Sequence, residues 1–268
     1  MQCAVSDVQN IQLGILRTCR DICQRYGLTY FLFGDTLRGA VRGGKFLSGS
    51  TEAALLMPSG DLKNFCAYFA REAPEGLFLS CVETEKEYPY LTVRVRKDNT
   101  VGEAERLLGL SGHHGISVSL YPYYPMEVGR LARPCTKAYV WLAERLLGAS
   151  LVSCLEKPVL LDTIFAKIPI EKRLAWAGKA VRKLEKGSKK SMQVCVPLGG
   201  AVFFWREALG EEETFVATLS GEEFRVPDRK EVFLNMAVPE GEKRLTGEML
   251  WKTVAGEEKK NKKPTGKQ

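Results

Sequence analysis

The residues whose types and spacing best suit chemistry lie in one short stretch near the N-terminus. Gly34-Asp35-Thr36 follows an apolar run, Tyr30 to Phe33, and precedes a segment of helical character that carries Arg38 and Arg42. A strand that ends at a glycine and leads into a helix presents backbone N–H groups at the positive end of the helix dipole, which suits a phosphate. Two arginines four residues apart share one helix face and can reach the same anion. The stretch predicts a phosphate-binding turn, although any glycine-containing strand–turn–helix has these features.

The same stretch carries a family resemblance. GDTLRGAVRGGKF at 34–46, followed eleven residues later by Met57-Pro58, resembles the signature of the LicD family. This family is the phosphocholine-transferase-like branch of the nucleotidyltransferase fold, which also includes the fukutin-like proteins. Val93 to Thr100 resembles the family's K-h-R-x-x-x-T strand and turn, and Gly115 to Pro122 stands where the family reads like I-D-I-F-P. The resemblance also implies that Arg94 takes part in nucleotide binding.

Further along, Phe224 to Pro227 followed by Leu234 resembles the family's closing segment, so the matches extend from about Ile11 to Pro239. The resemblance implies an α/β (α+β) fold, a nucleotidyltransferase-like mixed sheet flanked by helices with a helical and small β extension. We expect one domain over residues 1–255, with its core at about 8–125 and the extension at about 133–240. The Lys-rich, apolar-poor segment 256–268 is expected to be a disordered basic tail.

The family's metal carboxylates are mostly absent from this chain. In the family, a D-h-D pair after the helix and an aspartate in the I-D-I-F-P segment hold a divalent metal. The corresponding residues here are Glu52 and Ala54 for the pair and Ser119 for the third carboxylate. Mg²⁺ is a hard cation that takes oxygen ligands and offsets phosphate charge in phosphoryl transfer. One glutamate, one hydroxyl and one methyl group make a poor site, so the resemblance implies the fold more strongly than the catalyst.

Hydrophobic periodicity predicts the elements that must position these residues. Residues 8–26 form an amphipathic helix that leads into a central strand from Thr29, and a helix starting at Ser59 turns Leu62, Phe65, Cys66 and Phe69 inward. Tyr121 to Pro125 is expected to be a rigid aromatic turn. Further helices are expected at 138–147, 159–168, 172–184 and 230–236, and further strands at 53–57, 77–82, 90–95, 192–196, 201–205, 214–219 and 224–226.

Two groups of cations are candidates for anion binding. Arg94 and Arg96 alternate with apolar residues in a strand, so we expect them to line a cleft or, as we favour, to meet water. The segment from Lys179 to Lys190 is a basic helix end, which is either a solvated surface or a landing site for an anionic acceptor. The adjacent His113 and His114 point in different directions, so they make a poor joint metal site.

Composition limits the remaining classes. The 268 residues are 45% hydrophobic with a net charge of +7, which permits a full core and mildly favours anionic partners. No apolar run is long enough to span a bilayer, and the N-terminus lacks the pattern of a signal peptide. Eight cysteines occur singly, which is typical of free thiols in a reducing compartment. These features predict a cytoplasmic protein with no membrane span and no nucleic-acid partner.

Three functions remain open. The favoured one is a LicD-like pseudoenzyme of cell-surface glycan phosphocholine modification, which binds a CDP-linked or other nucleotide or assists an active paralogue. The alternative is an active transferase that uses Mg²⁺ or Mn²⁺ to move a phosphocholine-like group from a CDP-linked donor to an anionic glycan acceptor. In it, Glu52 holds the metal and acts in catalysis with Asp35, whose other interpretation is a turn or N-cap residue. A third possibility is a basic scaffold for acidic polymers.

Overall fold

The computed structural model describes residues 4–104, 111–126, 132–154, 160–186, 193–198, 201–205, 215–228, 234 and 249–253. Its helices are α1 (Val5–Arg25), α2 (Gly34–Gly43), α3 (Ser59–Glu72), α4 (Ala132–Gly148), the 3₁₀ segment η2 (Ala149–Cys154), α5 (Leu160–Ala166) and α6 (Ile170–Glu185). Its strands are β1 (Phe31–Leu32), β2 (Ala54–Pro58), β3 (Leu77–Ser80), β4 (Val93–Lys97), β5 (Thr100–Ala104), β6 (Ser117–Met126), β7 (Gln193–Leu198), β8 (Ala201–Trp205), β9 (Phe215–Leu219), β10 (Glu222–Val226) and β11 (Met249–Thr253).

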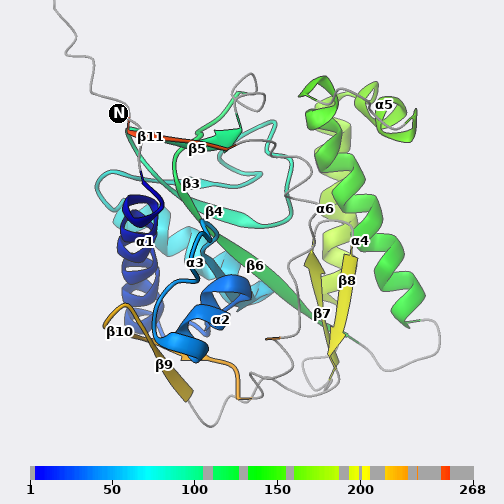
Figure 1. Cartoon of the computed structure of the whole chain (residues 1–268). Helices are drawn as coiled ribbons and strands as arrows, with labels where there is room; N and C mark the ends of the chain where they lie inside the picture. The colour runs from blue at the N-terminus through cyan, green and yellow to red at the C-terminus, as the bar shows by residue number, and fades with distance from the viewer. Residues whose placement is uncertain are drawn as a thin grey trace, which may run out of the picture.

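Strand β6 is the centre of a seven-stranded mixed sheet, shown as the long strand in the middle of Figure 1. The order is β1-β2-β6-β4-β3, with β2 parallel to β6 and the other neighbours antiparallel. The C-terminal part of β6 pairs with β7, which pairs with β8. The mixed α/β fold expected from the sequence is therefore confirmed. The central place expected for the first strand is wrong, because β1 has only two residues and lies at the sheet edge.

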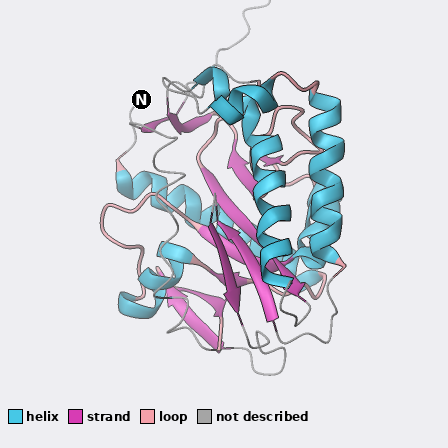
Figure 2. Cartoon of the chain, turned by 90° about the vertical axis from the view of Figure 1, so that its right-hand side faces the viewer, coloured by secondary structure: helices cyan, strands magenta, loops and turns pink. Residues whose placement is uncertain are grey.

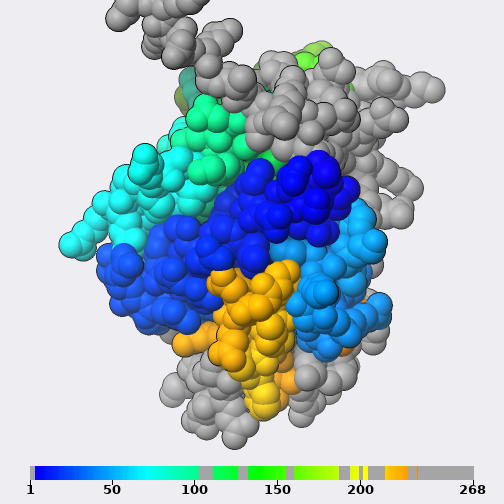
Figure 3. Space-filling view, turned by 60° about the vertical axis from the view of Figure 1, so that its left-hand side comes forward, coloured from blue at the N-terminus to red at the C-terminus, as the bar shows by residue number. Residues whose placement is uncertain are grey.

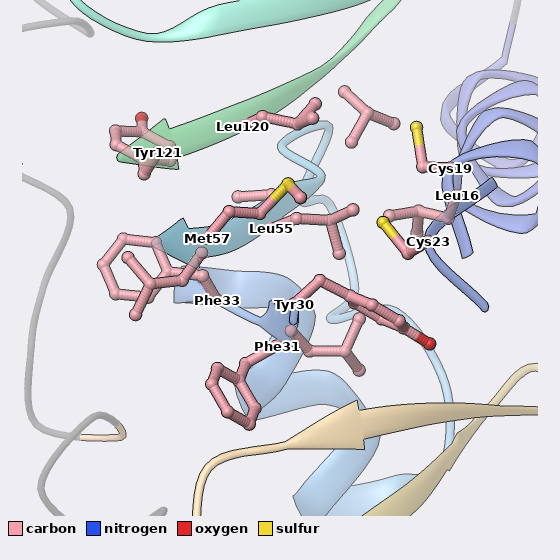
Figure 4. Close-up of a cluster of buried hydrophobic side chains, with 14 of the residues drawn as sticks. Leu16, Cys19, Cys23, Tyr30, Phe31, Phe33, Leu55, Met57, Leu120 and Tyr121 are labelled. Carbon is pink, nitrogen blue, oxygen red and sulfur yellow. The ribbon is translucent and has the colours of Figure 1, made fainter. Parts of the chain in front are cut away.

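Helices α1 and α3 contribute the largest core cluster, together with the sheet. Figure 4 shows Leu16, Cys19 and Cys23 of α1 beside Leu55 of β2 and Leu120 of β6. The helical spacing of these α1 residues matches the face that is buried in the structure. Of the residues expected to face inward on α3, three are buried (Leu62, Phe65, Phe69) and Cys66 is half-buried.

Helices α4 and α6 pack together and against the other end of the sheet, as Figure 2 shows. Tyr124 of β6 and Cys195 of β7 form one cluster with Val140 of α4 and Leu184 of α6. The two helices also share a second cluster of small and branched residues. Pro169 precedes the first residue of α6, a position where the missing N–H of proline has no cost.

The expected aromatic turn at 121–125 is wrong, because these residues lie within β6. Pro122 pairs with Met57 of β2 on one side of the strand. On the other side, pairing with β4 ends at Leu120 and pairing with β7 begins at Tyr124. A proline cannot donate to a ladder, and at Pro122 the strand has a neighbour on one side only.

The β9–β10 hairpin lies against the N-terminal helices. Figure 3 shows it, in yellow and orange, between α1 and the α2 region. Glu222 of β10 accepts hydrogen bonds from Arg17 and Arg20 of α1, and the Ser220 N–H donates to the Gly44 carbonyl at 2.6 Å. The expected helix at 230–236 lies outside the described residues except for Leu234, and the expected tail lies outside them altogether.

Candidate functional site

The turn between β1 and α2 is fixed to β2 by two hydrogen bonds. The Phe33 N–H donates to the Ala54 carbonyl at 3.0 Å, and the Ala54 N–H donates to the Thr36 hydroxyl at 2.9 Å. Gly34 has φ +57°, which a residue with a side chain rarely adopts. The predicted succession of strand, glycine and helix is therefore present, with Gly34, Asp35 and Thr36 in the first turn of α2; phosphate binding there stays a prediction.

Asp35 is held on both of its carboxylate oxygens. Oδ1 accepts a hydrogen bond from Arg38 Nη1 at 2.7 Å, and Oδ2 accepts one from the Ser50 hydroxyl at 3.0 Å. The Ser50 oxygen in turn accepts the Glu52 N–H at 3.4 Å. The structure therefore brings Asp35 to the turn that contains Glu52, but with an arginine already paired to its carboxylate.

The positions that correspond to the family's metal carboxylates lie beside one another. Ala54 and Ser119 are register partners in the parallel pair β2–β6, and Glu52 lies two residues before Ala54. Directly paired residues point to the same face of a sheet. On that face, the next strand places Arg94 opposite Ser119, and β3 places Ser80 opposite Arg94.

These side chains do not fit a divalent metal. A Mg²⁺ or Mn²⁺ ion takes oxygen ligands, with carboxylates supplying the charge. Ala54 offers a methyl group, Ser119 a neutral hydroxyl, and Asp35 is ion-paired with Arg38. Within the described ranges, no group of three or more His, Cys, Asp or Glu residues could hold a metal ion. We therefore derive no step that passes through a metal.

The three arginines expected to bind a nucleotide differ in their surroundings. Arg38 donates from Nε to the Leu234 carbonyl at 3.2 Å, in addition to its pair with Asp35. Arg42 is exposed in the last turn of α2. The favoured expectation that Arg94 and Arg96 meet water is wrong, because they are only 6% and 3% exposed.

Arg94 and Arg96 are covered by chain segments that flank the sheet. The Arg94 guanidinium lies 4.3 Å from the centre of the Tyr90 ring, a cation–π contact. Arg96 donates to the Gly115 carbonyl at 3.2 Å. Alternation along a strand places a side chain on a face, and it does not show whether a loop covers that face.

A histidine that the sequence did not assign to any site has a clear structural role. His113 Nε2 lies 2.9 Å from Asp98 Oδ1, and the ring stacks on Phe78 with centroids 5.1 Å apart. The His113 N–H donates to Glu85 at 2.8 Å. Burial lowers the pKa of His113, and the nearby Arg96 lowers it further, while the Asp98 carboxylate opposes both effects. These contacts tie the loop after β5 to the edge of the sheet.

A comparison of the chain with the models of known protein families and with curated proteins gives no match. The LicD resemblance therefore depends on the motifs quoted above. No helix within the described ranges is long and apolar enough to cross a membrane.

Proposed function

We propose that this chain is a LicD-like pseudoenzyme of cell-surface glycan phosphocholine modification, which binds a nucleotide-linked ligand or assists an active partner without metal-dependent transfer. One observation carries the proposal: Ala54 and Ser119 are register partners at the position where the resemblance expects metal carboxylates. The two positions are adjacent on paired strands, but an alanine and a serine lack the negative charge that holds a metal in phosphoryl transfer.

The ligand-binding part of the proposal is supported by the first turn of α2. Its backbone N–H groups are at the positive end of the helix dipole. Arg38 stabilises Asp35, which would otherwise place an unpaired negative charge beside an incoming phosphate. The turn is thus suited to an anion more than to a cation.

The alternative, an active phosphotransferase, is favoured by one specific contact. Ser50 donates to the Asp35 carboxylate and accepts the Glu52 N–H, so the turn that carries Glu52 is bonded to Asp35 of α2. This alternative would need Asp35 and Glu52 to hold a divalent metal together, which Asp35 could do only without its ion pair to Arg38. The alternative therefore requires binding that depends on the metal.

Calorimetric titration with CDP-choline and with CTP, each with and without Mg²⁺ or Mn²⁺, distinguishes the pseudoenzyme from the active phosphotransferase. The proposal expects binding of similar affinity with and without the metal. Binding that strengthens tenfold or more with either metal would overturn it in favour of the active enzyme. Absence of binding to both nucleotides under all conditions would overturn the ligand-binding role.

A gain-of-function variant tests the role of the missing carboxylates. The double change Ala54→Asp with Ser119→Asp restores the acidic set, and we expect it to make nucleotide binding depend on the metal. Ser117→Asp is the matched control, because Ser117 precedes Ser119 by two residues and points to the same face. A metal response that is equal in the control and in the double variant would contradict the assignment of these positions.

A further inference from the structure

A cavity lies on the opposite face of the sheet from Ser119 and Arg94. It has a volume of about 680 Å³ and lies between α3, the strands β3, β4 and β6, and helix α6. Val93 and Pro122 line it, and each is an odd number of residues from Arg94 and Ser119 respectively, so alternation places them on the other face. The volume is within the range of about 300–1,000 Å³ that is typical of small-molecule sites.

The interior of the cavity is mainly apolar. Most of its lining side chains are aliphatic, and they come from every element that surrounds it; examples are Leu62, Leu79, Val93, Leu147, Leu174 and Val181. The charged lining residues are Lys63, Glu83, Arg182 and Glu185. A ligand that fills the interior must therefore be mainly apolar, since a buried polar group without a partner costs free energy.

The charged lining residues come from α3, from the segment after β3 and from the last turns of α6. Lys63 of α3 forms an ion pair with Glu185 of α6 at 2.7 Å, so these two charges offset each other across the gap between the helices. Arg182 is exposed on the last turns of α6, among the cations Lys179, Lys183 and Lys186. Glu83 lies next to Cys81, which follows β3, because its side chain acts on the thiol of that residue. The last turns of α6 thus carry an excess of positive charge.

We propose that this cavity binds an amphiphile with a single alkyl chain and an anionic head group. The chain fills the aliphatic interior, and the head group lies beside Arg182 in the last turns of α6. The observations that carry this inference are the volume, the mainly apolar lining and the cationic end of α6. It does not depend on the proposed nucleotide site, which uses the other face of the sheet.

Gly178 allows a test that does not damage the fold. It lies in α6 and lines the cavity, and a Cβ added there meets only the end of the Arg182 side chain, at 3.5 Å. Gly178→Leu therefore fills part of the cavity, and it also removes a glycine that is unfavourable within a helix. Gly14→Leu in α1 is the matched control, because a Cβ at Gly14 meets nothing within 4 Å and Gly14 does not line the cavity.

The probe is dansyl-undecanoate, whose fluorescence rises when its chain leaves water, displaced by hexadecanoate. We expect wild type and Gly14→Leu to bind it equally, and Gly178→Leu to lose affinity at least tenfold while unfolding in urea at an equal or higher concentration. Wild-type protein that does not bind the probe, or equal binding by both glycine variants, would overturn the proposal.

A charge reversal tests the head group. Arg182→Glu should weaken hexadecanoate binding at least threefold and leave hexadecanol binding unchanged. Lys172→Glu is the control, since Lys172 is exposed on the same helix but does not line the cavity. Equal losses for hexadecanoate and hexadecanol, or equal losses in both charge variants, would refute the assignment of the anionic head.

The single-chain amphiphile can be free in solution or held in a bilayer, and vesicles of phosphatidylcholine that contain hexadecanoate distinguish the two sources. A free amphiphile predicts tight binding of monomeric hexadecanoate and no sedimentation with vesicles. A bilayer lipid predicts sedimentation with vesicles that is lost in Gly178→Leu. Sedimentation that is equal in wild type and Gly178→Leu, without binding of the monomer, would overturn the cavity as the site.

Discussion

Among the glycines of α2, Gly39 should tolerate a side chain poorly, because the backbone of the following turn lies against it. A Cβ at Gly39 would overlap the Lys45 carbonyl oxygen and lie 3.1 Å from the Leu47 nitrogen and 3.2 Å from the Phe46 Cα. All three are backbone atoms of the turn that follows α2, so the main chain has to move. That turn is itself bonded to the helix, because the Lys45 N–H donates to the Gly39 carbonyl at 3.4 Å.

The magnitude follows from a comparison with Gly14, where a Cβ meets nothing within 4 Å. Replacing a helical glycine by alanine stabilises a helix by about 0.5–1 kcal/mol. Gly14→Ala should therefore raise the free energy of unfolding by that amount. In Gly39→Ala the same gain is opposed by overpacking, which costs about 1–3 kcal/mol. The difference between the two variants isolates the overlap, so we expect Gly39→Ala to be less stable than Gly14→Ala by about 1–3 kcal/mol.

Urea denaturation followed by circular dichroism measures both values under identical conditions. The slope of unfolding free energy against urea should be the same for both variants, because the area exposed on unfolding does not change. If Gly39→Ala proves as stable as Gly14→Ala within experimental error, the turn after α2 does not approach the helix as described. The geometry that places Ser50 and Glu52 near Asp35 would then be in doubt as well.

Three further outcomes are expected. Arg94→Lys should destabilise the protein to urea by about 1–2 kcal/mol, because lysine cannot reproduce the planar contact with Tyr90; an unchanged midpoint would contradict this. A hydrogen bond from Cys66 lowers the pKa of Cys81 to about 7. Alkylation of Cys81 by iodoacetamide, mapped by mass spectrometry, should therefore rise around that pH in the wild type. In Cys66→Ala the same rise should occur at a higher pH. Two arginines of α1 lower the pKa of Glu222. The wild type should therefore be more stable than Glu222→Gln at neutral pH and lose this advantage as the pH falls through the lowered pKa of Glu222. A stability advantage that persists in acid would be evidence against the ion pair.

Helices were predictable from sequence where periodicity was strong. The inward face of α3 and the break before α6 both follow from apolar spacing and from Pro169, and the structure confirms them. The turn at Gly34 was predictable because a strand must end before a helix begins, and Gly34 adopts a backbone conformation that favours glycine. Local chemistry determines each of these features, so a sequence is sufficient to find them.

Features that depend on distant partners were not predictable. The apolar run at 30–33 indicates a buried strand, but nothing in it shows that β1 lies at an edge of the sheet. Arg94 and Arg96 alternate like solvated residues, and their burial depends on other segments, including Tyr90 and Gly115. Within the candidate site, the spacing of Asp35 and Arg38 is compatible with an ion pair, whereas the bond from Ser50 depends on the path of the turn.

Strands β5 and β11 form a separate two-stranded antiparallel sheet, and their pairing affects the order of folding. Thr100 and Thr253 are register partners, although they are 153 residues apart in the chain. Closing a loop of that length costs about 4–5 kcal/mol of chain entropy beyond a constant. On a ribosome, β5 leaves the exit tunnel long before β11 is synthesised. We therefore expect the part of the chain up to β6 to fold first and β11 to pair last. Until then β5 has an unpaired strand edge, which can pair with another chain and lead to aggregation.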